Sequence, residues 1–215
     1  MKILHLIASP RGEQSRTLAI TREFIVALQA RHQEVAVTEL NLFEVELPPV
    51  HGDAVAAKYA LISGQELNEK KRDSWRRIAE LANDFMAFDA YVISAPMWNF
   101  TIPYVLKHYI DVIMQAGILF QFTERGPIGL AQHKRMVCIC SRGSDYGPAS
   151  PLNSLDYQAT YLRAIFGFAG IQDISFINAQ PLDLNPDLTR EKLELSKAEA
   201  RHLATSWGEL IGNMS

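Results

Sequence analysis

The chain alternates between short apolar segments rich in β-branched residues and longer segments whose apolar residues recur at helical intervals. The short apolar segments predict five strands, at residues 2–8, 34–40, 90–95, 135–141 and 173–179. The amphipathic segments predict helices at about 15–30, 68–88, 103–115, 154–166 and 189–210. Strands that alternate with helices imply right-handed crossovers and a parallel sheet. The pattern therefore predicts an α/β fold, a doubly wound five-stranded parallel sheet with helices on both faces.

Two connections between these elements are too long for minimal turns. Residues 41–53 include Leu47-Pro48-Pro49, and residues 116–134 include Phe120 and Phe122. Loops of this length are usually functional or form interfaces. We expect each connection to wall a pocket or to meet a second subunit.

Composition favours one soluble domain that handles small ligands. The 215 residues are 48% hydrophobic, enough for one core, and no composition shift marks a linker, so residues 1–215 are expected to form a single domain. The net charge of -3 is dispersed, which indicates neither nucleic-acid nor membrane binding. No apolar run approaches the roughly 20 residues of a membrane span, and no cleavage signature precedes the first strand. A cytoplasmic location is expected.

The loop after the first predicted strand leads directly into a helix and carries hydroxyl groups at Ser9, Ser15 and Thr17. Backbone N–H groups at a helix N-terminus bind anions, and the hydroxyl groups can add hydrogen bonds to a phosphate. The glycine patterns of dinucleotide and nucleoside-triphosphate loops are absent, which favours a monophosphate. Alternatively, Ser15 only caps the helix, and the loop taken alone favours that interpretation.

The loop after the third predicted strand, Pro96-Met97-Trp98-Asn99-Phe100, presents aromatic and amide groups directly after a buried strand. Such a loop suits a flat ligand, although exposed apolar loops also mark protein interfaces. The loop after the fourth strand, Ser141-Arg142-Gly143-Ser144, can approach the polar edge of a ring, or can form ordinary turns. In a doubly wound sheet these three loops meet at one edge, which favours a single shared ligand.

Other reactive side chains give weaker signals. Cys138 and Cys140 lie two positions apart in a strand and are expected to be buried thiols, not a redox pair. The six histidines show no triad or ligand spacing, so no catalytic histidine and no metal site are expected. Taken individually, Arg11, Arg16 and Arg142 are expected to be solvated charges. A phosphorylated receiver domain would share the fold, but it needs carboxylates after the first strand, where this chain has none.

Five motifs together resemble one family. They are SPRGEQSRT, PMWNF, GILFQFTERGPIGL, SRGS and YLRAIFGFAGI, in that order along the chain. With these motifs the chain resembles, from residue 1 to about 178, the FMN-dependent NADH:quinone oxidoreductases known as azoreductases, in the flavodoxin-like superfamily. The resemblance implies a homodimer with one FMN per subunit. It also implies a two-step reaction in which NADH or NADPH reduces the flavin and leaves before a quinone or azo compound enters the same site.

The resemblance also implies roles for individual residues. Those for the phosphate and ribityl end are Ser9, Ser15, Arg16 and Thr17; those along the flavin ring are Pro96, Met97, Trp98, Asn99 and Phe100; those at its pyrimidine edge are Ser141, Arg142, Gly143 and Ser144. The backbone N–H of Asn99 is expected near the hydride-accepting nitrogen. Phe122 and Phe168 are expected to cover the open face of the flavin, largely from the partner subunit, and so to contact the substrate.

This chain departs from the family pattern at three positions, and one alternative function stays open. Ser144 stands where a second glycine is usual, Phe122 where many relatives have tyrosine, and Tyr146 where some have histidine. Tyr146 is the second predicted catalytic position, and together with Phe122 it is expected to influence the choice of acceptor. The alternative is a flavodoxin-like electron carrier. Such carriers have a strongly acidic docking face, whereas this chain is nearly balanced in charge.

Overall fold

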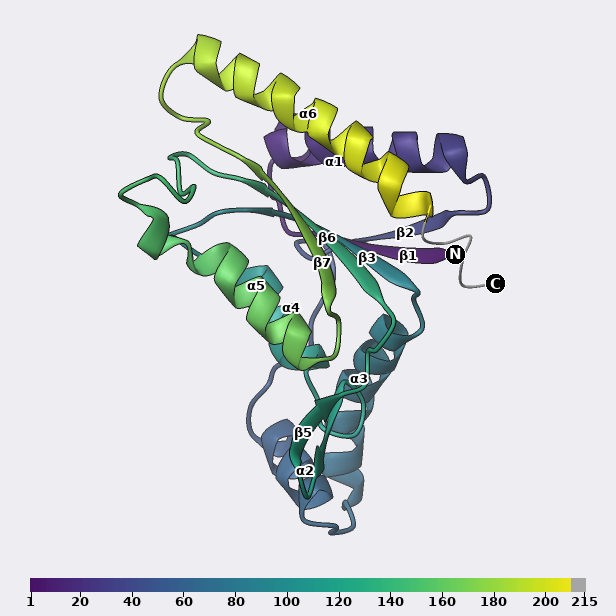
Figure 1. Cartoon of the computed structure of the whole chain (residues 1–215). Helices are drawn as coiled ribbons and strands as arrows, with labels where there is room; N and C mark the ends of the chain where they lie inside the picture. The colour runs from purple at the N-terminus through teal and green to yellow at the C-terminus, as the bar shows by residue number, and fades with distance from the viewer. Residues whose placement is uncertain (210–215) are drawn as a thin grey trace.

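A computed structural model describes residues 1–209 and contains a five-stranded sheet in the order β2-β1-β3-β6-β7 (Figure 1). All four strand pairings in this sheet are parallel, which confirms the predicted sheet. The strands are β1 (Lys2–Ile7), β2 (Ala36–Asn41), β3 (Ala90–Pro96), β6 (Arg135–Ser141) and β7 (Asp173–Ala179). β2 begins two residues later than predicted because residues 32–35 form a turn, closed by the bond from Val35 N to His32 O.

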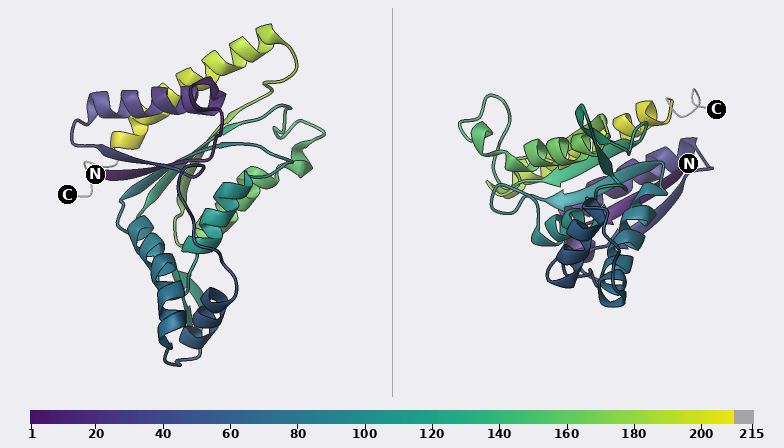
Figure 2. Two further views of the ribbon diagram at one scale, coloured as in Figure 1. Left: turned by 180° about the vertical axis from the view of Figure 1, so that it is seen from behind. Right: turned by 90° about the horizontal axis from the view of Figure 1, so that it is seen from below.

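Helices cover both faces of the sheet, as predicted (Figures 1 and 2). One face carries α1 (Arg16–Arg31) and α6 (Pro186–Glu209), and the other carries α3 (Glu69–Met86), α4 (Tyr104–Ile113) and α5 (Tyr157–Phe168). α5 starts later than predicted because the Asp156 side chain caps it by accepting from Ala159 N. The predicted end of the last helix, at residue 210, lies outside the described residues. Within residues 1–209, no helix has both the length and the apolar character that crossing a membrane requires.

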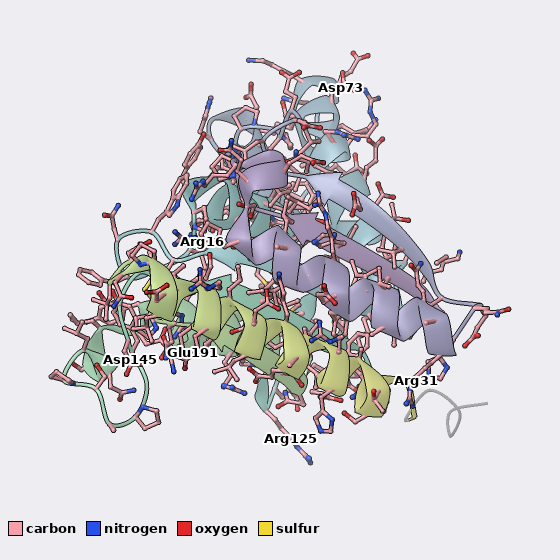
Figure 3. The ribbon with its side chains drawn as sticks, turned by 90° about the horizontal axis from the view of Figure 1, so that it is seen from above. Arg16, Arg31, Asp73, Arg125, Asp145 and Glu191 are labelled. Atoms are coloured by element: carbon pink, nitrogen blue, oxygen red, sulfur yellow. The ribbon has the colours of Figure 1, made fainter. Side chains whose placement is uncertain are left out.

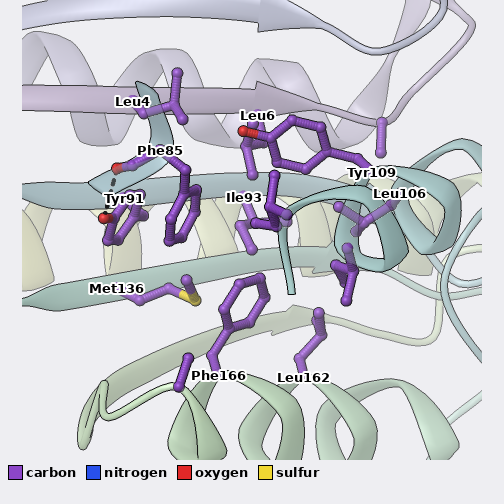
Figure 4. Close-up of a cluster of buried hydrophobic side chains, with 14 of the residues drawn as sticks. Leu4, Leu6, Phe85, Tyr91, Ile93, Leu106, Tyr109, Met136, Leu162 and Phe166 are labelled. Atoms are coloured by element: carbon purple, nitrogen blue, oxygen red, sulfur yellow. Dashed lines mark hydrogen bonds between the residues drawn. The ribbon is translucent and has the colours of Figure 1, made fainter. Parts of the chain in front are cut away.

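The face beneath α3, α4 and α5 contains the larger apolar cluster (Figure 4). The ring of Phe85 on α3 stacks on that of Tyr91 on β3 with centroids 4.1 Å apart, and the ring of Phe166 on α5 lies 6.1 Å from that of Phe85. The Tyr91 hydroxyl donates to Phe85 O at 2.8 Å, so its one polar atom is satisfied. This packing ties α3 and α5 to the amino end of β3.

The two long connections contain or lead into structure that the sequence pattern did not predict. The first, residues 41–53, ends where the unpredicted helix α2 (Asp53–Ile62) begins, and α2 packs on α3 through the small buried residues Ala54, Ala57 and Ala60. Their three-residue spacing is the signal that the prediction missed. The second contains an antiparallel hairpin of β4 (Phe120–Thr123) and β5 (Gly126–Gly129).

Glycine allows the hairpin to approach the end of α5. A Cβ atom at Gly129 would lie 2.2 Å from the backbone nitrogen of Gly170. Next to it, Ala131 N donates to Ala169 O at 2.8 Å. Because a side chain at position 129 would collide with backbone, the contact requires glycine there.

Candidate functional site

A pocket of about 370 Å³ lies at the carboxyl edge of the sheet, where the loops after β1, β3, β6 and β7 converge. Figure 3 looks down on α1 and α6, with Arg16 at the start of α1 and Asp145, in the loop after β6, toward the same end of the molecule. The predicted site residues that line the pocket are Ser9, Ser15, Arg16, Pro96, Met97, Trp98, Ser141, Arg142 and Gly143. The fold therefore brings the three predicted loops to one pocket.

A fourth loop, which the sequence did not reveal, completes the pocket with Leu182 and Asp183. Arg16 Nη1 donates to Leu182 O at 2.8 Å and to Asp183 Oδ1 at 2.7 Å. A Cβ atom at Gly143 would lie 2.6 Å from Asp183 Oδ2, so glycine at 143 leaves room for the Asp183 carboxylate in this position. Asp183 is 167 positions from Arg16, and no local motif marks it.

The loop after β1 is held by its own hydroxyl groups. Ser15 caps α1, since its Oγ accepts from Leu18 N at 3.1 Å, and it also bonds Ser9 Oγ at 2.7 Å. Thr17 does not line the pocket: it is buried, and its Oγ1 lies 2.6 Å from Ser141 Oγ. Ser15 therefore caps α1, as the alternative interpretation of this loop expected, and the N-terminus of α1 also lines the pocket at Ser15 and Arg16.

The loop after β3 ends in a tight and strained turn. Trp98 and Thr101 exchange backbone hydrogen bonds of 2.9 and 3.0 Å, and the residues between them have positive φ, 48° at Asn99 and 70° at Phe100. Two successive left-handed residues are typical of a type I′ turn, which usually contains glycine. A bulky residue there stores strain of a kind that gathers at functional sites. Asn99 and Phe100 are exposed and lie outside the pocket lining.

Arg142 is internal, and its interpretation as a solvated charge is wrong. Its side chain is 2% exposed, and Nη1 donates to Asp156 Oδ2 at 2.9 Å. Nε donates to Gln158 Oε1 at 3.1 Å, and Nη1 also reaches Gln180 Oε1 at 3.2 Å. A guanidinium group can be buried when its donors are satisfied in this way. Arg142 thus ties the loop after β6 to the start of α5.

Two other predicted residues of this loop lie beside the pocket and not in its lining. Ser144 is half-buried, and Tyr146 is buried with its backbone N–H donating to Gln180 Oε1 at 3.2 Å. The ring of Tyr146 meets that of Phe100 edge-on, with centroids 6.4 Å apart. Tyr146 therefore supports the strained turn after β3.

Phe122 on the hairpin and Phe168 at the end of α5 form a separate aromatic group around Phe120. The Phe120 centroid is 5.5 Å from that of Phe122 and 4.8 Å from that of Phe168. Neither Phe122 nor Phe168 lines the 370 Å³ pocket, and their exposed fractions are 66% and 40%. In a single chain the ring of Phe122 is mostly open to solvent, whereas Phe168 is partly covered and lines a separate, larger cavity.

A third aromatic group lies beside the pocket, and the sequence predicted only one of its members, Trp98, as a site residue. The centroid of Trp98 lies 6.3 Å from that of Phe43 and 6.4 Å from that of Tyr104. Phe43 directly follows Leu42 at the end of β2, so the carboxyl-edge rule that selected the other loops applies to it as well. The sequence prediction used only the loops after the first, third and fourth predicted strands.

A larger cavity of about 840 Å³ lies at the amino ends of β6 and β7, lined by residues such as Lys134, Arg135 and Asp173. No carboxyl end of a strand in the central sheet and no helix N-terminus is among the described residues that line it, in contrast to the smaller pocket. Open α/β sheets bind ligands at the carboxyl edge, so the smaller pocket is the candidate site. The two thiols contribute to neither cavity: both are buried, and burial raises the pKa of Cys140 to about 12.

Comparisons with known proteins agree with this geometry. A family model described as "Flavodoxin-like fold" matches residues 1–204. The FMN-dependent NADH:quinone oxidoreductase 2 of Pseudomonas syringae pv. tomato is 34% identical over 206 residues, 96% of this chain and 99% of the relative. The FMN-dependent NADH:quinone oxidoreductase of Rhizobium meliloti is 37% identical over 199 residues, 93% of this chain and 94% of the relative.

Solved structures give the same result. The FMN-dependent NADH-azoreductase of Bacillus anthracis, solved in complex with FMN, matches with a TM-score of 0.87 at 27% identity, covering 97% of this chain and 100% of that one. Full-length matches in sequence and in structure leave one assignment. The chain belongs to the FMN-dependent NADH:quinone oxidoreductase (azoreductase) family, within the flavodoxin-like fold.

Proposed function

We propose that the chain, residues 1–215 acting as one domain, is an FMN-dependent oxidoreductase that passes electrons from NADH or NADPH to quinones and azo compounds. The observation that carries the proposal is the pocket itself. It joins a helix N-terminus and two serines to Pro96, Met97 and Trp98 of the loop after β3. The names of its relatives, at more than 30% identity over nearly the whole chain, support the same activity.

The polar end of the pocket fits a phosphate. The N-terminus of α1 carries a partial positive charge and free N–H groups, and Ser9 and Ser15 add hydroxyl groups. Arg11 and Arg16 line the same end and supply positive charge. Because Arg16 is already held by Asp183, it is positioned before a ligand arrives, which lowers the entropy lost on binding.

The apolar end fits a flat ring. Pro96, Met97 and Trp98 line the pocket, and Ser141, which pairs with Pro96 in the sheet, and Gly143 supply polar groups beside them. FMN, when bound, supplies the two-electron chemistry, so the protein need only bind it, orient it and exclude water. The residues of this chain fit that task, which requires no separate acid–base group.

In the proposed two-step reaction, the reduced nicotinamide and then the acceptor use the same open face. We assign the Asn99 backbone N–H to the hydride-accepting edge of the ring, Ser144 to its pyrimidine edge, and Tyr146 to the side from which acceptors enter. Phe122 and Phe168 would reach the site from a second copy of the chain in a homodimer. Their exposure in one chain, and their position outside its pocket lining, support this assignment.

Absorbance and turnover test the proposal together. The purified protein should take up FMN with one flavin per chain, and NADH or NADPH should bleach it in stopped-flow mixing. A quinone should then restore the colour. Protein that takes up no FMN would overturn the proposal, and a flavin that nicotinamide cannot bleach would indicate an electron carrier instead. Sedimentation of the active protein should report a dimer, and a fully active monomer would remove the shared site.

A pair of variants tests the role of Asn99. Asn99→Gly keeps the backbone N–H and tolerates φ of 48°, so flavin reduction should stay within about twofold of wild type. Asn99→Pro loses the N–H and cannot reach positive φ, so reduction should slow by about tenfold or more, the scale of one lost charge-stabilising donor. Equal rates in the two variants would show that neither the amide nor the turn matters. The bound-flavin spectrum, measured first, separates slow reduction from weak FMN binding.

A further inference from the structure

A chain of buried hydrogen bonds links β2, β1, β3 and α1 beneath the start of α1. His5 on β1 is 2% exposed. Its Nε2 lies 2.8 Å from Ser94 Oγ and its Nδ1 lies 3.3 Å from Glu39 Oε1. Ser94 Oγ lies 2.6 Å from Thr21 Oγ1, which lies 3.0 Å from Thr17 O. This series of hydrogen bonds therefore runs from a carboxylate at the surface to the backbone of the first turn of α1.

The Glu39–His5–Ser94 arrangement has the residue types of a hydrolytic triad, but it cannot act as one. Ser94 is completely buried, and its hydroxyl is already bonded to Thr21. A nucleophile must reach a substrate, so these three residues cannot perform acyl transfer. Their role has to be internal.

The protons on these groups permit three arrangements of the hydrogen bonds: His5 as an imidazolium, or neutral His5 with its proton on Nδ1 or on Nε2. A carbonyl oxygen can only accept, so whenever Thr21 bonds Thr17 O, the hydroxyl proton of Thr21 is donated to that carbonyl and is not available to Ser94. Ser94 must then donate to Thr21, and His5 Nε2 must donate to Ser94. The bond from Nδ1 to the Glu39 carboxylate also needs a proton on the ring. All four contacts are satisfied together when His5 is an imidazolium.

Neutral His5 with its proton on Nδ1, the nitrogen that faces the Glu39 carboxylate, reverses the direction of these hydrogen bonds, whereas a proton on Nε2 would leave the direction unchanged and the contact with Glu39 without a proton. With the single ring proton on Nδ1 donated to Glu39, Nε2 is an acceptor, so Ser94 donates to His5 and Thr21 donates to Ser94. The hydroxyl of Thr21 is then turned away from Thr17 O. Between the two states the ring exchanges one proton with solvent. The two hydroxyl groups keep their protons and only rotate.

We propose that His5 and Ser94 are positioning residues for the first turn of α1, and that the protonation of His5 sets whether Thr21 donates to the carbonyl of Thr17. Thr17 also joins this turn to the loop after β6, through its 2.6 Å contact with Ser141 Oγ. The consequence for ligand binding rests on the proposed function, since that turn is the proposed phosphate site. The reversal of the hydrogen bonds does not depend on it.

The surroundings of His5 set the direction of its titration. β2 presents the Glu39 carboxylate to the ring, β3 the hydroxyl of Ser94, and α1 the hydroxyl of Thr21. Burial lowers the pKa of His5, and the hydrogen bond and charge of Glu39 oppose that shift in part. Neutral His5 therefore dominates at neutral pH, and acidification produces the state in which Thr21 donates to Thr17 O.

The protonation of His5 and the hydrogen bond to the Thr17 carbonyl are thus coupled through Ser94 and Thr21, and these four residues form a relay. Nuclear magnetic resonance of the protein without FMN tests the relay directly. At neutral pH the ring should carry its proton on Nδ1, and on acidification the Thr17 carbonyl carbon should shift with the same midpoint as the ring. In Ser94→Ala the ring should still titrate while the Thr17 carbonyl no longer follows. A ring protonated on Nε2 at neutral pH would overturn the proposal, as would a Thr17 carbonyl that does not follow the ring in wild type.

FMN affinity as a function of pH tests the link to the site. In wild type the Kd for FMN should change by about threefold across the His5 titration, the scale of one ordinary hydrogen bond. Thr21→Val should abolish that component, whereas His32→Gln, which removes a titratable histidine elsewhere, should keep it. An unchanged component in Thr21→Val would refute the link. If no FMN binds, the proposed function fails, and the carbonyl titration still decides the relay.

Discussion

The two faces of the central sheet are built from the same five strands but are filled differently. Toward α3, α4 and α5, the middle of the sheet presents apolar side chains, among them Leu4, Leu6 and Ile93. Toward α1 and α6, the strands alternate apolar residues with His5 and Ser94, which bond to each other and to Thr21. A single step along a strand changes the face and with it the kind of interaction.

The difference separates stability from positioning. Apolar packing is not directional and stabilises the fold in proportion to the area that it buries. Buried hydrogen bonds contribute less net free energy, but they fix direction, and a missing partner is costly. Only the α1 face also carries the helix whose N-terminus opens onto the pocket. We therefore expect changes in the apolar cluster beneath α3, α4 and α5 to lower stability most. Changes to the buried polar residues His5, Ser94 and Thr21, which lie among apolar side chains on the α1 face, should alter the site and its response to pH.

The largest effect is expected from Phe85→Ala on the apolar face. The ring stacks on that of Tyr91 and is completely buried, so its loss should cost about 3–5 kcal/mol of the free energy of unfolding. Urea denaturation measures it. The matched control is Phe122→Ala, at an exposed ring, which should change stability by less than about 1 kcal/mol. Equal losses at the two positions would contradict the assignment of stability to this face.

A smaller loss of unfolding free energy is expected from Ser94→Ala, in the hydrogen-bonded group on the α1 face. It leaves His5 Nε2 and Thr21 Oγ1 without their shared partner, at a cost of about 1–3 kcal/mol. Adding His5→Leu to this variant should cost less than the separate effects predict, because removing both partners of a hydrogen bond is cheaper than removing one. A double variant whose losses simply add would show that the two residues do not act as a unit.

The pH dependence of stability is expected to depend on His5, which lies on the α1 face, and not on the apolar cluster of the other face. The pKa of His5 is lowered in the fold, so the unfolded chain binds its proton more readily. Stability should be highest above the ordinary histidine pKa of about 6.5 and should decline as the pH falls toward and through the lowered value. In His5→Leu this part of the decline should vanish, as measured by urea denaturation at pH 5 to 8. The Phe85→Ala variant should keep it, and its loss there would undo the comparison.

The smallest effect is expected from Thr21→Ser, which keeps the hydroxyl group and loses one buried methyl group. The loss of stability should be about 1 kcal/mol or less. Because the relay needs only the hydroxyl, the pH dependence of FMN affinity should match wild type. A changed pH dependence in this variant would indicate that packing, and not hydrogen bonding, couples His5 to α1.

Particular elements explain why the prediction succeeded and where it failed. The central strands were predicted well because runs such as Ala90–Pro96 are apolar on both faces, which marks a buried parallel strand. The helix α2 was missed because its buried face is made of alanines, which give little contrast with their surroundings. The hairpin was missed because its strands are short, and the close approach of Gly129 that anchors it is a tertiary contact.

The candidate site divides in the same way. Its three loops could be predicted because each follows a strand of the parallel sheet, and such strands end at a common edge. Arg142 was misjudged because its partners, Asp156, Gln158 and Gln180, are 14 to 38 positions away. Asp183 was missed for the same reason, since only the fold sets it against Arg16.

The sequence by itself determined the five strands of the central sheet and the α-helices other than α2, the doubly wound architecture and the loops that meet at the carboxyl edge. These follow from periodicity and chain connectivity, which are local properties of the chain. Only the tertiary structure decided which hydroxyl, carboxylate and imidazole groups share protons. His5 meets Glu39 and Ser94 from 34 and 89 positions away, and hydrogen bonds act over about 3 Å, a separation that no spacing along the chain encodes.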